Sequence, residues 1–404
     1  MEKKKTDRDI KAWIVLAVVY LASITVTMSL MKIPPLMGIL IADLHTSTTV
    51  GGLFMSAFMM AGVILAIPAA SLLDRWGPKK SGLASLVFTI CGSVLGSFSY
   101  GSPLVLLIGR FIEGIGFGGM MVIAPAVISM WFEPEKRGLP MGIWATWVPI
   151  GLFIMYNIAQ PLESLFNWRI VWWFNGAFAL LVLLLYWVVV DYPDGMKKGA
   201  EEAEAAPYSG VKLHSGLRNV NTWLLTGIFF IYGMTVQGYT TWLPTDLVES
   251  GIFPPMANFY SSLITMGRIP GIILAGFILG FAKKHQTILG FGLTLAVVVF
   301  GLWFLIGDIS HVVFWMVALG LSTGLAPTTI FTLTTETASR PELIGIALAL
   351  VNMGFNTGQI IGPPVIGMII GRGSWVPVYY FILIPLFISA VLALQIRMEK
   401  DEHL

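Results

Sequence analysis

Four charged residues stand inside long apolar stretches of this 404-residue chain: Lys32, Arg110, Glu113 and Arg268. A charged side chain at the centre of a lipid bilayer costs about 2.5–3.5 kcal/mol on insertion scales, so each needs a partner or a function. Three cations against one acid leave an excess of two positive charges in these stretches. Cations that share a cavity attract anions, and the pattern therefore predicts a binding site for a negatively charged substrate.

The elements that must position these charges are membrane-spanning helices. Hydrophobic residues make up 56% of the chain and charged residues only 11%, whereas about a quarter of the residues of a soluble protein are charged. Because a helix needs about 20 apolar residues to cross the bilayer, we predict an all-α membrane protein with twelve transmembrane helices. The predicted spans are 12–41, 47–72, 81–100, 103–130, 138–160, 168–190, 219–245, 255–281, 286–306, 310–335, 341–370 and 375–396.

The loop charges predict the orientation of these helices. Nineteen of the 24 Lys and Arg residues fall in stretches on one side, and only Arg169 and Arg372 fall on the other. Lys and Arg are enriched in cytoplasmic loops. We therefore expect a multi-pass protein of the cell (inner, cytoplasmic) membrane with both termini in the cytoplasm.

The chain has the signs of an internal duplication. "APAVISMWFEPEKRG" at Ala124 parallels "APTTIFTLTTETASR" at Ala326, an offset of 202 residues. We predict an N-terminal six-helix bundle at 1–190, a polar cytoplasmic loop at 191–218 and a C-terminal six-helix bundle at 219–404, with pseudo-symmetry between the bundles. Repeats of this kind are typical of secondary transporters, whose sites lie near the middle of the membrane.

The four charges are expected at similar depths. Lys32 precedes Asp43 by eleven residues, or roughly 16 Å of helix. Lys32 is expected to bind the substrate. The alternative is that its side chain snorkels, extending so that the ammonium group reaches the outer membrane interface. Arg110 and Glu113 are three residues apart and meet on one helix face, either as a structural pair or as a coupling device in which Glu113 exchanges a proton when Arg110 is drawn to substrate. Arg268 has no acid within four residues, which favours a substrate role.

Two motifs resemble the major facilitator superfamily: "SLLDRWGPKK" after the second predicted span, and "GRFIEGIGFGG" in the fourth. The resemblance implies two bundles that rock about a central site in alternating access. It also implies a gating role for Asp74, Arg75, Gly77 and Arg137, with Asp74 pairing with Arg137 or with a helix end.

Further candidates lie on the helices that the resemblance places around the cavity. Gln237 and Tyr239 are in span 219–245, and Trp147 in span 138–160 offers an apolar wall. Asn352, Asn356 and Gln359 recur at i, i+4 and i+7 and so share one face of span 341–370. For each of them the alternative is helix packing or hydrogen bonding between helices.

Within the superfamily, the chain looks similar to cyanate-permease-type porters through "TTWLPTDLVESG" and "NMGFNTGQIIGPP". A lysine in the first span and an arginine in the eighth also resemble monocarboxylate and oxalate–formate porters, where such residues meet the carboxylate. Some monocarboxylate porters have an acid one turn before that arginine. Here the position is Ile264, so their proton mechanism does not carry over.

We therefore predict a secondary transporter of a small, carboxylate-type anion, with proton symport, anion exchange and uniport all open. A multidrug or organic-cation exporter of the same fold is the alternative, and the positive balance argues against it. A membrane enzyme would need a catalytic cluster, and no such constellation is found among the residues. We expect no cofactor, metal or nucleic acid, and we expect a monomer in the bilayer whose partners are the anion and, in symport, protons.

Overall fold

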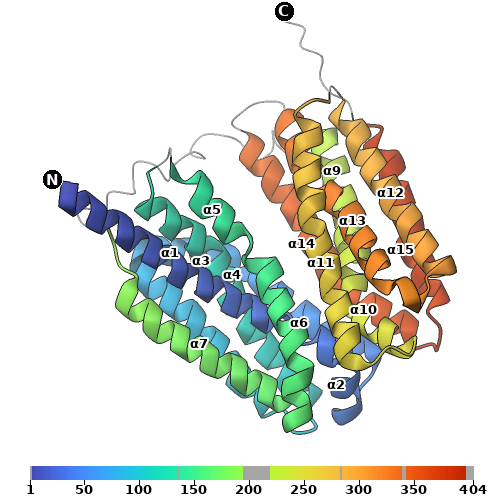
Figure 1. Cartoon of the computed structure of the whole chain (residues 1–404), viewed down its shortest axis with the longest axis horizontal. Coiled ribbons are helices and arrows are strands. Elements are labelled where there is room, and N and C mark those ends of the chain that lie inside the picture. Colours follow the sequence, from blue (N-terminus) through green and yellow to red (C-terminus); the bar gives the residue numbers. More distant parts are fainter. Residues whose placement is uncertain (1, 134–135, 194–218, 283, 339–342, 397–404) are drawn as a thin grey trace, which may run out of the picture. The chain divides into compact units, whose positions relative to one another are not determined.

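The computed structural model of the chain describes residues 2–133, 136–193, 219–282, 284–338 and 343–396, without the side chains of 2–8, 65–72 and 74. These residues form helices and connecting turns and no strand (Figure 1). The chain divides into two compact units. The first comprises residues 1–46 and 53–205, and the second comprises 47–52 and 206–404. The predicted loop 191–218 lies almost wholly outside the described residues.

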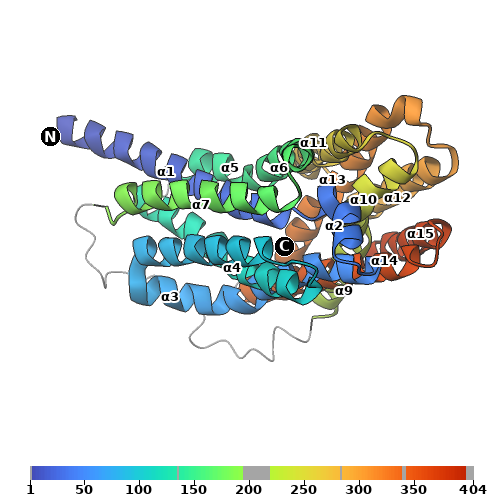
Figure 2. The same cartoon turned by 90° about the horizontal axis from the view of Figure 1, so that it is seen from below.

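The helices of the first unit follow the predicted apolar runs. They are α1 (Glu2–Leu30), the short η1 (Pro34–Leu36), α2 (Met37–Asp43), α3 (Thr48–Ser97), α4 (Pro103–Trp131), α5 (Gly138–Ala145), α6 (Trp147–Leu165) and α7 (Arg169–Val189). Helix α1 packs against α4, α6 and α7, which makes it the centre of this unit. Figure 2 shows α3 and α4 lying together as one layer below α1 and α7.

Helix α3 joins two predicted spans that the sequence separates. Its backbone turns at Gly77, which has φ of 76° and ψ of 173°. A positive φ is the conformation that glycine adopts without steric cost. The motif "SLLDRWGPKK" therefore forms a kink between two helical halves.

The second unit has its own set of helices. They are α9 (Val220–Tyr232), the π-helical η4 (Gly233–Gln237), α10 (Gly238–Glu249), α11 (Pro254–Leu279), α12 (His285–Ile306), η5 (Ile309–His311), α13 (Val312–Glu336), α14 (Ile344–Ile370) and α15 (Val376–Ala393). Helices α11 and α13 approach closely, because Gly267 faces Gly320 and Gly271 faces Gly324. Small residues at such contacts let helix backbones pack in a membrane.

The predicted all-helical membrane fold is confirmed. Ten helical stretches of the described residues are long and apolar enough to cross a membrane, and Thr48–Ile64 is a shorter apolar helix. The span predicted at 219–245 is interrupted by η4, where five residues adopt π-helical geometry. Such π-bulges are frequent at functional sites.

Most polar side chains of the buried first helix are satisfied locally. Ser23 donates to the carbonyl of Val19 at 2.9 Å, and Thr25 donates to that of Leu21 at 2.8 Å. A hydroxyl that bonds the preceding turn adds little polarity to a buried helix. The charged groups, which have no such local solution, are therefore the ones that need explanation.

Candidate functional site

The break between α1 and η1 positions Lys32. The α-helix ends at Leu30, and two prolines follow at 34 and 35. Because Pro34 has no N–H, the carbonyl of Leu30 loses the donor that a continuous helix would provide. Lys32 stands in this interruption with its side chain fully buried.

Arg110 of α4 provides donors for two carbonyls at the end of α1 and for one carbonyl of α3. Its guanidinium donates to the carbonyl oxygens of Ser29 at 2.5 Å, Leu30 at 3.0 Å and Phe54 at 3.2 Å. It also donates to Oε2 of Glu113 at 2.6 Å. A guanidinium has five N–H groups. The Arg110 side chain is 0% exposed, and its guanidinium donates four hydrogen bonds to the protein. Arg110 therefore ties α1 and α3 to α4.

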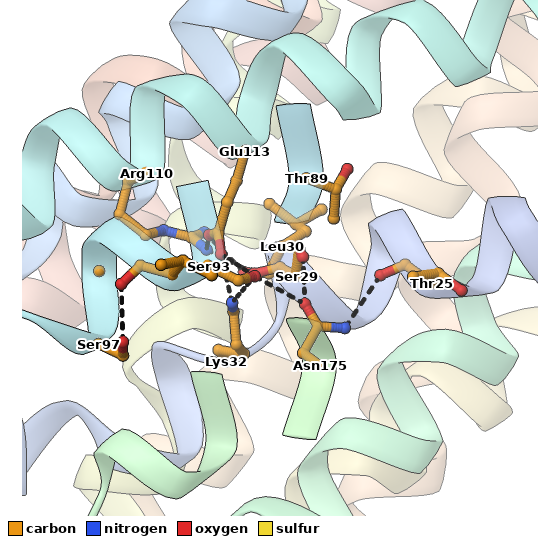
Figure 3. A network of polar contacts seen from close by, with 12 residues as sticks. Thr25, Ser29, Leu30, Lys32, Thr89, Ser93, Ser97, Arg110, Glu113 and Asn175 are labelled. Atoms are coloured by element: carbon orange, nitrogen blue, oxygen red, sulfur yellow. Dashed lines mark hydrogen bonds and ion pairs between the residues drawn. The ribbon is translucent and has the colours of Figure 1, made fainter. Parts of the chain in front are cut away.

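Glu113 lies between two cations. Its Oε2 pairs with Arg110, and its Oε1 pairs with the ammonium of Lys32. Ser93 of α3 accepts from Lys32 at 3.1 Å and donates to Glu113 Oε1 at 2.7 Å. All three charged side chains are 0% exposed (Figure 3). Two cations and one carboxylate give this cluster a formal charge of +1.

Asn175 of α7 completes this network. Its side-chain oxygen accepts from the Ser29 hydroxyl, and its amide donates to the carbonyl of Thr25 at 3.3 Å (Figure 3). Aromatic rings cover the cations: Lys32 Nζ lies 4.8 Å from the centroid of Trp172. A cation over an aromatic face is stabilised by the ring quadrupole, and more so when desolvated.

The cationic site of the second unit is built differently. Arg268 of α11 donates to Gln237 Oε1 at 2.5 Å, to Thr240 Oγ1 at 3.1 Å and to Thr323 Oγ1 at 3.4 Å. Gln237 belongs to the π-helical η4, and Thr240 lies in the first turn of α10. The three acceptors are neutral, and the guanidinium is half-buried. Among the described residues, no carboxylate lies within 4.0 Å of Arg268.

The remaining predicted site residues are distributed over several helices. Tyr239 is fully buried and contacts Asp246 and Trp303 rather than Arg268. Trp147 is 5% exposed and stacks on Trp144, with ring centroids 5.7 Å apart.

The amides predicted to share one face of α14 differ in burial. Asn352 is exposed and donates to the carbonyl of Leu348 at 3.1 Å. Asn356 and Gln359 are half-buried.

Three of the predicted gating residues, Asp74, Arg75 and Gly77, lie at the kink of α3, and the fourth, Arg137, lies between α4 and α5. Arg75 is exposed, whereas Gly77 is buried against the hydroxyl of Tyr192. Arg137 donates to the carbonyls of Ser129 at 2.8 Å and Phe132 at 2.9 Å, and so binds the last turn of α4. The side chain of Asp74, its predicted partner, lies outside the described residues.

Sequence reasoning missed three polar members of these networks: Ser93, Asn175 and Asp246. Asn175 stands in the apolar run "WWFNGAFALL", where an uncharged amide is a signal of a helix contact. Asp246 stands in "TTWLPTDLVESG", next to the predicted end of a span, and therefore was not counted as an intramembrane charge.

Comparison with known proteins places this arrangement in a family. The model of the Major Facilitator Superfamily matches residues 19–347 and 312–403. This chain belongs to that superfamily. The superfamily resemblance noted from "SLLDRWGPKK" and "GRFIEGIGFGG" is therefore confirmed.

Individual relatives of this superfamily member are named as transporters. A probable sulfoacetate transporter of Cupriavidus necator is 25% identical over 369 residues, which is 82% of this chain and 81% of the relative. A probable galactarate/D-glucarate transporter of Escherichia coli is 24% identical and covers 79% of this chain and 78% of its own length. A hexuronate transporter of Bacillus subtilis is 24% identical over 60% of this chain and 58% of its own length.

Solved structures of the same fold agree. A D-xylose–proton symporter superposes with a TM-score of 0.75 at 15% identity, covering 97% of this chain and 99% of the symporter. A bacterial homologue of the lysosomal transporter Spinster gives 0.72 at 17% identity, with coverage of 97% and 99%. At this identity the likeness concerns the fold. With the family match, it identifies the chain as a multi-pass membrane protein and a secondary transporter rather than an enzyme.

Proposed function

We propose that this transporter carries a small organic anion with a carboxylate or sulfonate group, and that Arg268 binds the charged group. The observation that carries the proposal is the half-buried guanidinium of Arg268, which has three neutral oxygen acceptors and, among the described residues, no counter-charge. A guanidinium presents a planar fork of donors that matches a carboxylate in two parallel hydrogen bonds. Gln237 and Thr240 hold that fork in place until the anion replaces them.

Lys32 and Arg110 of the first unit are proposed as further substrate ligands. Lys32 and Arg110 carry one more charge than Glu113 neutralises, and the residual positive charge favours an anion. Trp147 of the first unit is a proposed apolar contact of the substrate. Tyr239 positions α10 through its contacts with Asp246 and Trp303. The amides of Asn352, Asn356 and Gln359 are proposed to orient the polar end of the substrate.

The names of the relatives support this substrate class. Sulfoacetate, hexuronates, galactarate and D-glucarate, which those names contain, are all small organic anions. We propose that this transporter acts in the cytoplasmic membrane as a monomer, with both termini in the cytoplasm. Asp74, Arg75, Gly77 and Arg137 are its proposed gating residues. The alternative, an exporter of lipophilic cations, would need an acidic site, whereas the half-buried charge at 268 is basic.

A thermal-shift assay of the purified protein tests the substrate class. Sulfoacetate, D-glucuronate and D-glucarate are compared with the lipophilic cation tetraphenylphosphonium, because a ligand that binds the folded state raises the melting temperature. We expect at least one of the anions to stabilise the protein and Arg268→Ala to remove the effect. Arg372→Ala is the matched control, because Arg372 is exposed. Stabilisation by the cation alone would replace this proposal with the exporter.

Glu113 is the proposed proton acceptor of the first unit. In the present arrangement Lys32 and Arg110 both pair with its carboxylate, and we propose that it accepts a proton when substrate draws one of these cations away. Glu113→Gln should therefore abolish the pH dependence of transport into proteoliposomes while anion exchange continues. An unchanged pH profile would remove Glu113 from the coupling step.

A further inference from the structure

A second buried acid lies in the second unit, and none of the steps above uses it. Asp246 of α10 is 5% exposed. Its Oδ2 accepts from the hydroxyl of Tyr239 at 2.5 Å. Trp303 of α12 in turn donates its indole N–H to that hydroxyl oxygen at 2.9 Å. These three residues form a short chain of hydrogen bonds that ends on a carboxyl group.

Asp246 differs from Glu113 in having no cation beside it. Across the described part of the chain, no Lys, Arg or His nitrogen lies within 4.0 Å of its carboxyl group. An ionised carboxylate that is buried without a cation is far less stable than the neutral acid. Burial without a cation therefore favours the neutral, protonated form of Asp246, whereas Glu113 has two cations beside its carboxylate.

The groups that face Asp246 strengthen this conclusion. Its titratable neighbours are Tyr239, Glu249 one turn further along α10, and Tyr379 of α15. Glu249 is exposed and accepts from the indole of Trp375 at 2.7 Å, and its negative charge opposes ionisation of Asp246. Helix α14, which also packs on α10, carries no charged residue from 344 to 370.

The wall beside Tyr239 is aromatic. The ring of Tyr239 contacts Phe300 and Phe304 edge-on, with centroids 5.7 and 5.5 Å away, and Phe304 stacks on Tyr379 at 4.0 Å. These rings exclude water from the side of Tyr239 that faces α12 and α15. From this wall the Tyr239 hydroxyl donates to the carboxyl of Asp246, and the indole N–H of Trp303 donates to that hydroxyl.

One helix connects this acid to Arg268. Tyr239 contacts Asp246, and its neighbour Thr240 accepts from Arg268 at 3.1 Å. Both residues lie in the first turn of α10, directly after the π-helical segment that contains Gln237. A change in the contacts of Arg268 therefore acts on the same turn that holds the Asp246 hydrogen bond.

We propose that Asp246 is a proton-binding site of the second unit and that it holds its proton while an anion is bound at Arg268, a linkage that rests on the function proposed above. Above the pH range in which Asp246 of the free protein ionises, its carboxylate takes one proton from water as the anion binds and returns that proton to water after the anion leaves. The two events favour each other because a second negative charge in this poorly hydrated unit would repel the anion. By reciprocity, the proton increases affinity for the anion to the same extent that the anion increases affinity for the proton.

Infrared spectroscopy of the full-length protein tests the proton site without any substrate. We expect an absorption band of a protonated carboxyl group that disappears in Asp246→Asn and persists in Glu249→Gln, the exposed acid of the same helix. If Asp246→Asn fails to fold, Tyr239→Phe replaces it. Loss of the hydroxyl donor should make the carboxylate less stable, so the band should then persist to higher pH. A band that neither variant alters would overturn the proton site, whatever the fate of the substrate proposal.

Binding of D-glucarate at a series of pH values tests the linkage. If Asp246 takes up one proton with the anion, affinity falls about tenfold for each pH unit above the range in which Asp246 of the free protein ionises. Asp246→Asn should flatten this dependence, and Glu249→Gln should leave it unchanged. An equal slope in Asp246→Asn and the wild type would overturn the linkage. Absence of D-glucarate, sulfoacetate and D-glucuronate binding in the wild type would contradict the proposed function and with it the linkage, while leaving the infrared result standing.

Discussion

The two units place their cations in opposite surroundings. In the first unit Lys32 and Arg110 are fully buried and share the carboxylate of Glu113. In the second unit Arg268 is half-buried and contacts neutral oxygens. A buried charge with all its partners in place holds helices together, whereas a charge that has only neutral partners remains available to a ligand. This difference supports our proposal that Arg110 is chiefly structural and that Arg268 recognises the substrate.

The largest expected effect that tests this comparison is on stability. Arg110→Ala removes one of the two cations that pair with Glu113. It also removes the Arg110 donors from the carbonyls of Ser29 and Leu30. We expect it to lower the free energy of unfolding by about 3–5 kcal/mol, which is the usual cost of breaking a buried ion pair. Unfolding in mixed micelles measures this, with Arg268→Ala as the same change in the other unit. Equal losses in the two variants would contradict the division of roles.

A smaller loss is expected for Lys32→Met. The variant removes one of the two cations at Glu113 but keeps Arg110 and the Ser93 hydroxyl on its carboxylate. Because a polar group left with fewer partners costs about 1–3 kcal/mol, the unfolding free energy should fall by less than in Arg110→Ala. The same unfolding assay distinguishes the two. A loss as large as that of Arg110→Ala would show that the two cations are equally structural.

The smallest effect is expected for Gln237→Ala. It removes one neutral acceptor of Arg268, and a typical hydrogen bond contributes about 0.5–1.5 kcal/mol. Stability should change by no more than this, and D-glucarate affinity should change less than tenfold. Gln395→Ala, an exposed glutamine after α15, is the control. Complete loss of binding would move the centre of the site from Arg268 to Gln237.

Local patterns were enough to predict the helices and one ion pair. Apolar runs of about 20 residues identify spanning helices because the bilayer thickness sets their length. Arg110 and Glu113 could be expected to meet because three residues place them on one helix face, and the structure has that pair at 2.6 Å. Neither inference requires knowing how the helices pack.

Contacts between helices could not be predicted in the same way. The pairing of Lys32 with Glu113 joins residues 81 positions apart, and that of Ser29 with Asn175 joins residues 146 apart. The sequence shows that Lys32 stands inside an apolar run. Only the packing of the helices shows that Lys32 shares the carboxylate of Glu113 with Arg110. The π-helical segment at Gly233–Gln237 could not be predicted either, because its composition is that of an ordinary spanning helix.

Transport of D-glucarate, sulfoacetate and D-glucuronate into proteoliposomes most directly tests the central claim that Arg268 binds the anion. Wild type, Arg268→Ala and Arg372→Ala are compared, after thermal unfolding has shown that all three are folded. A hydrogen bond to a charged group contributes about 1.5–3 kcal/mol, so loss of the guanidinium should reduce uptake more than tenfold. Arg372→Ala should transport as the wild type does. Uptake by Arg268→Ala at the wild-type rate would contradict the account.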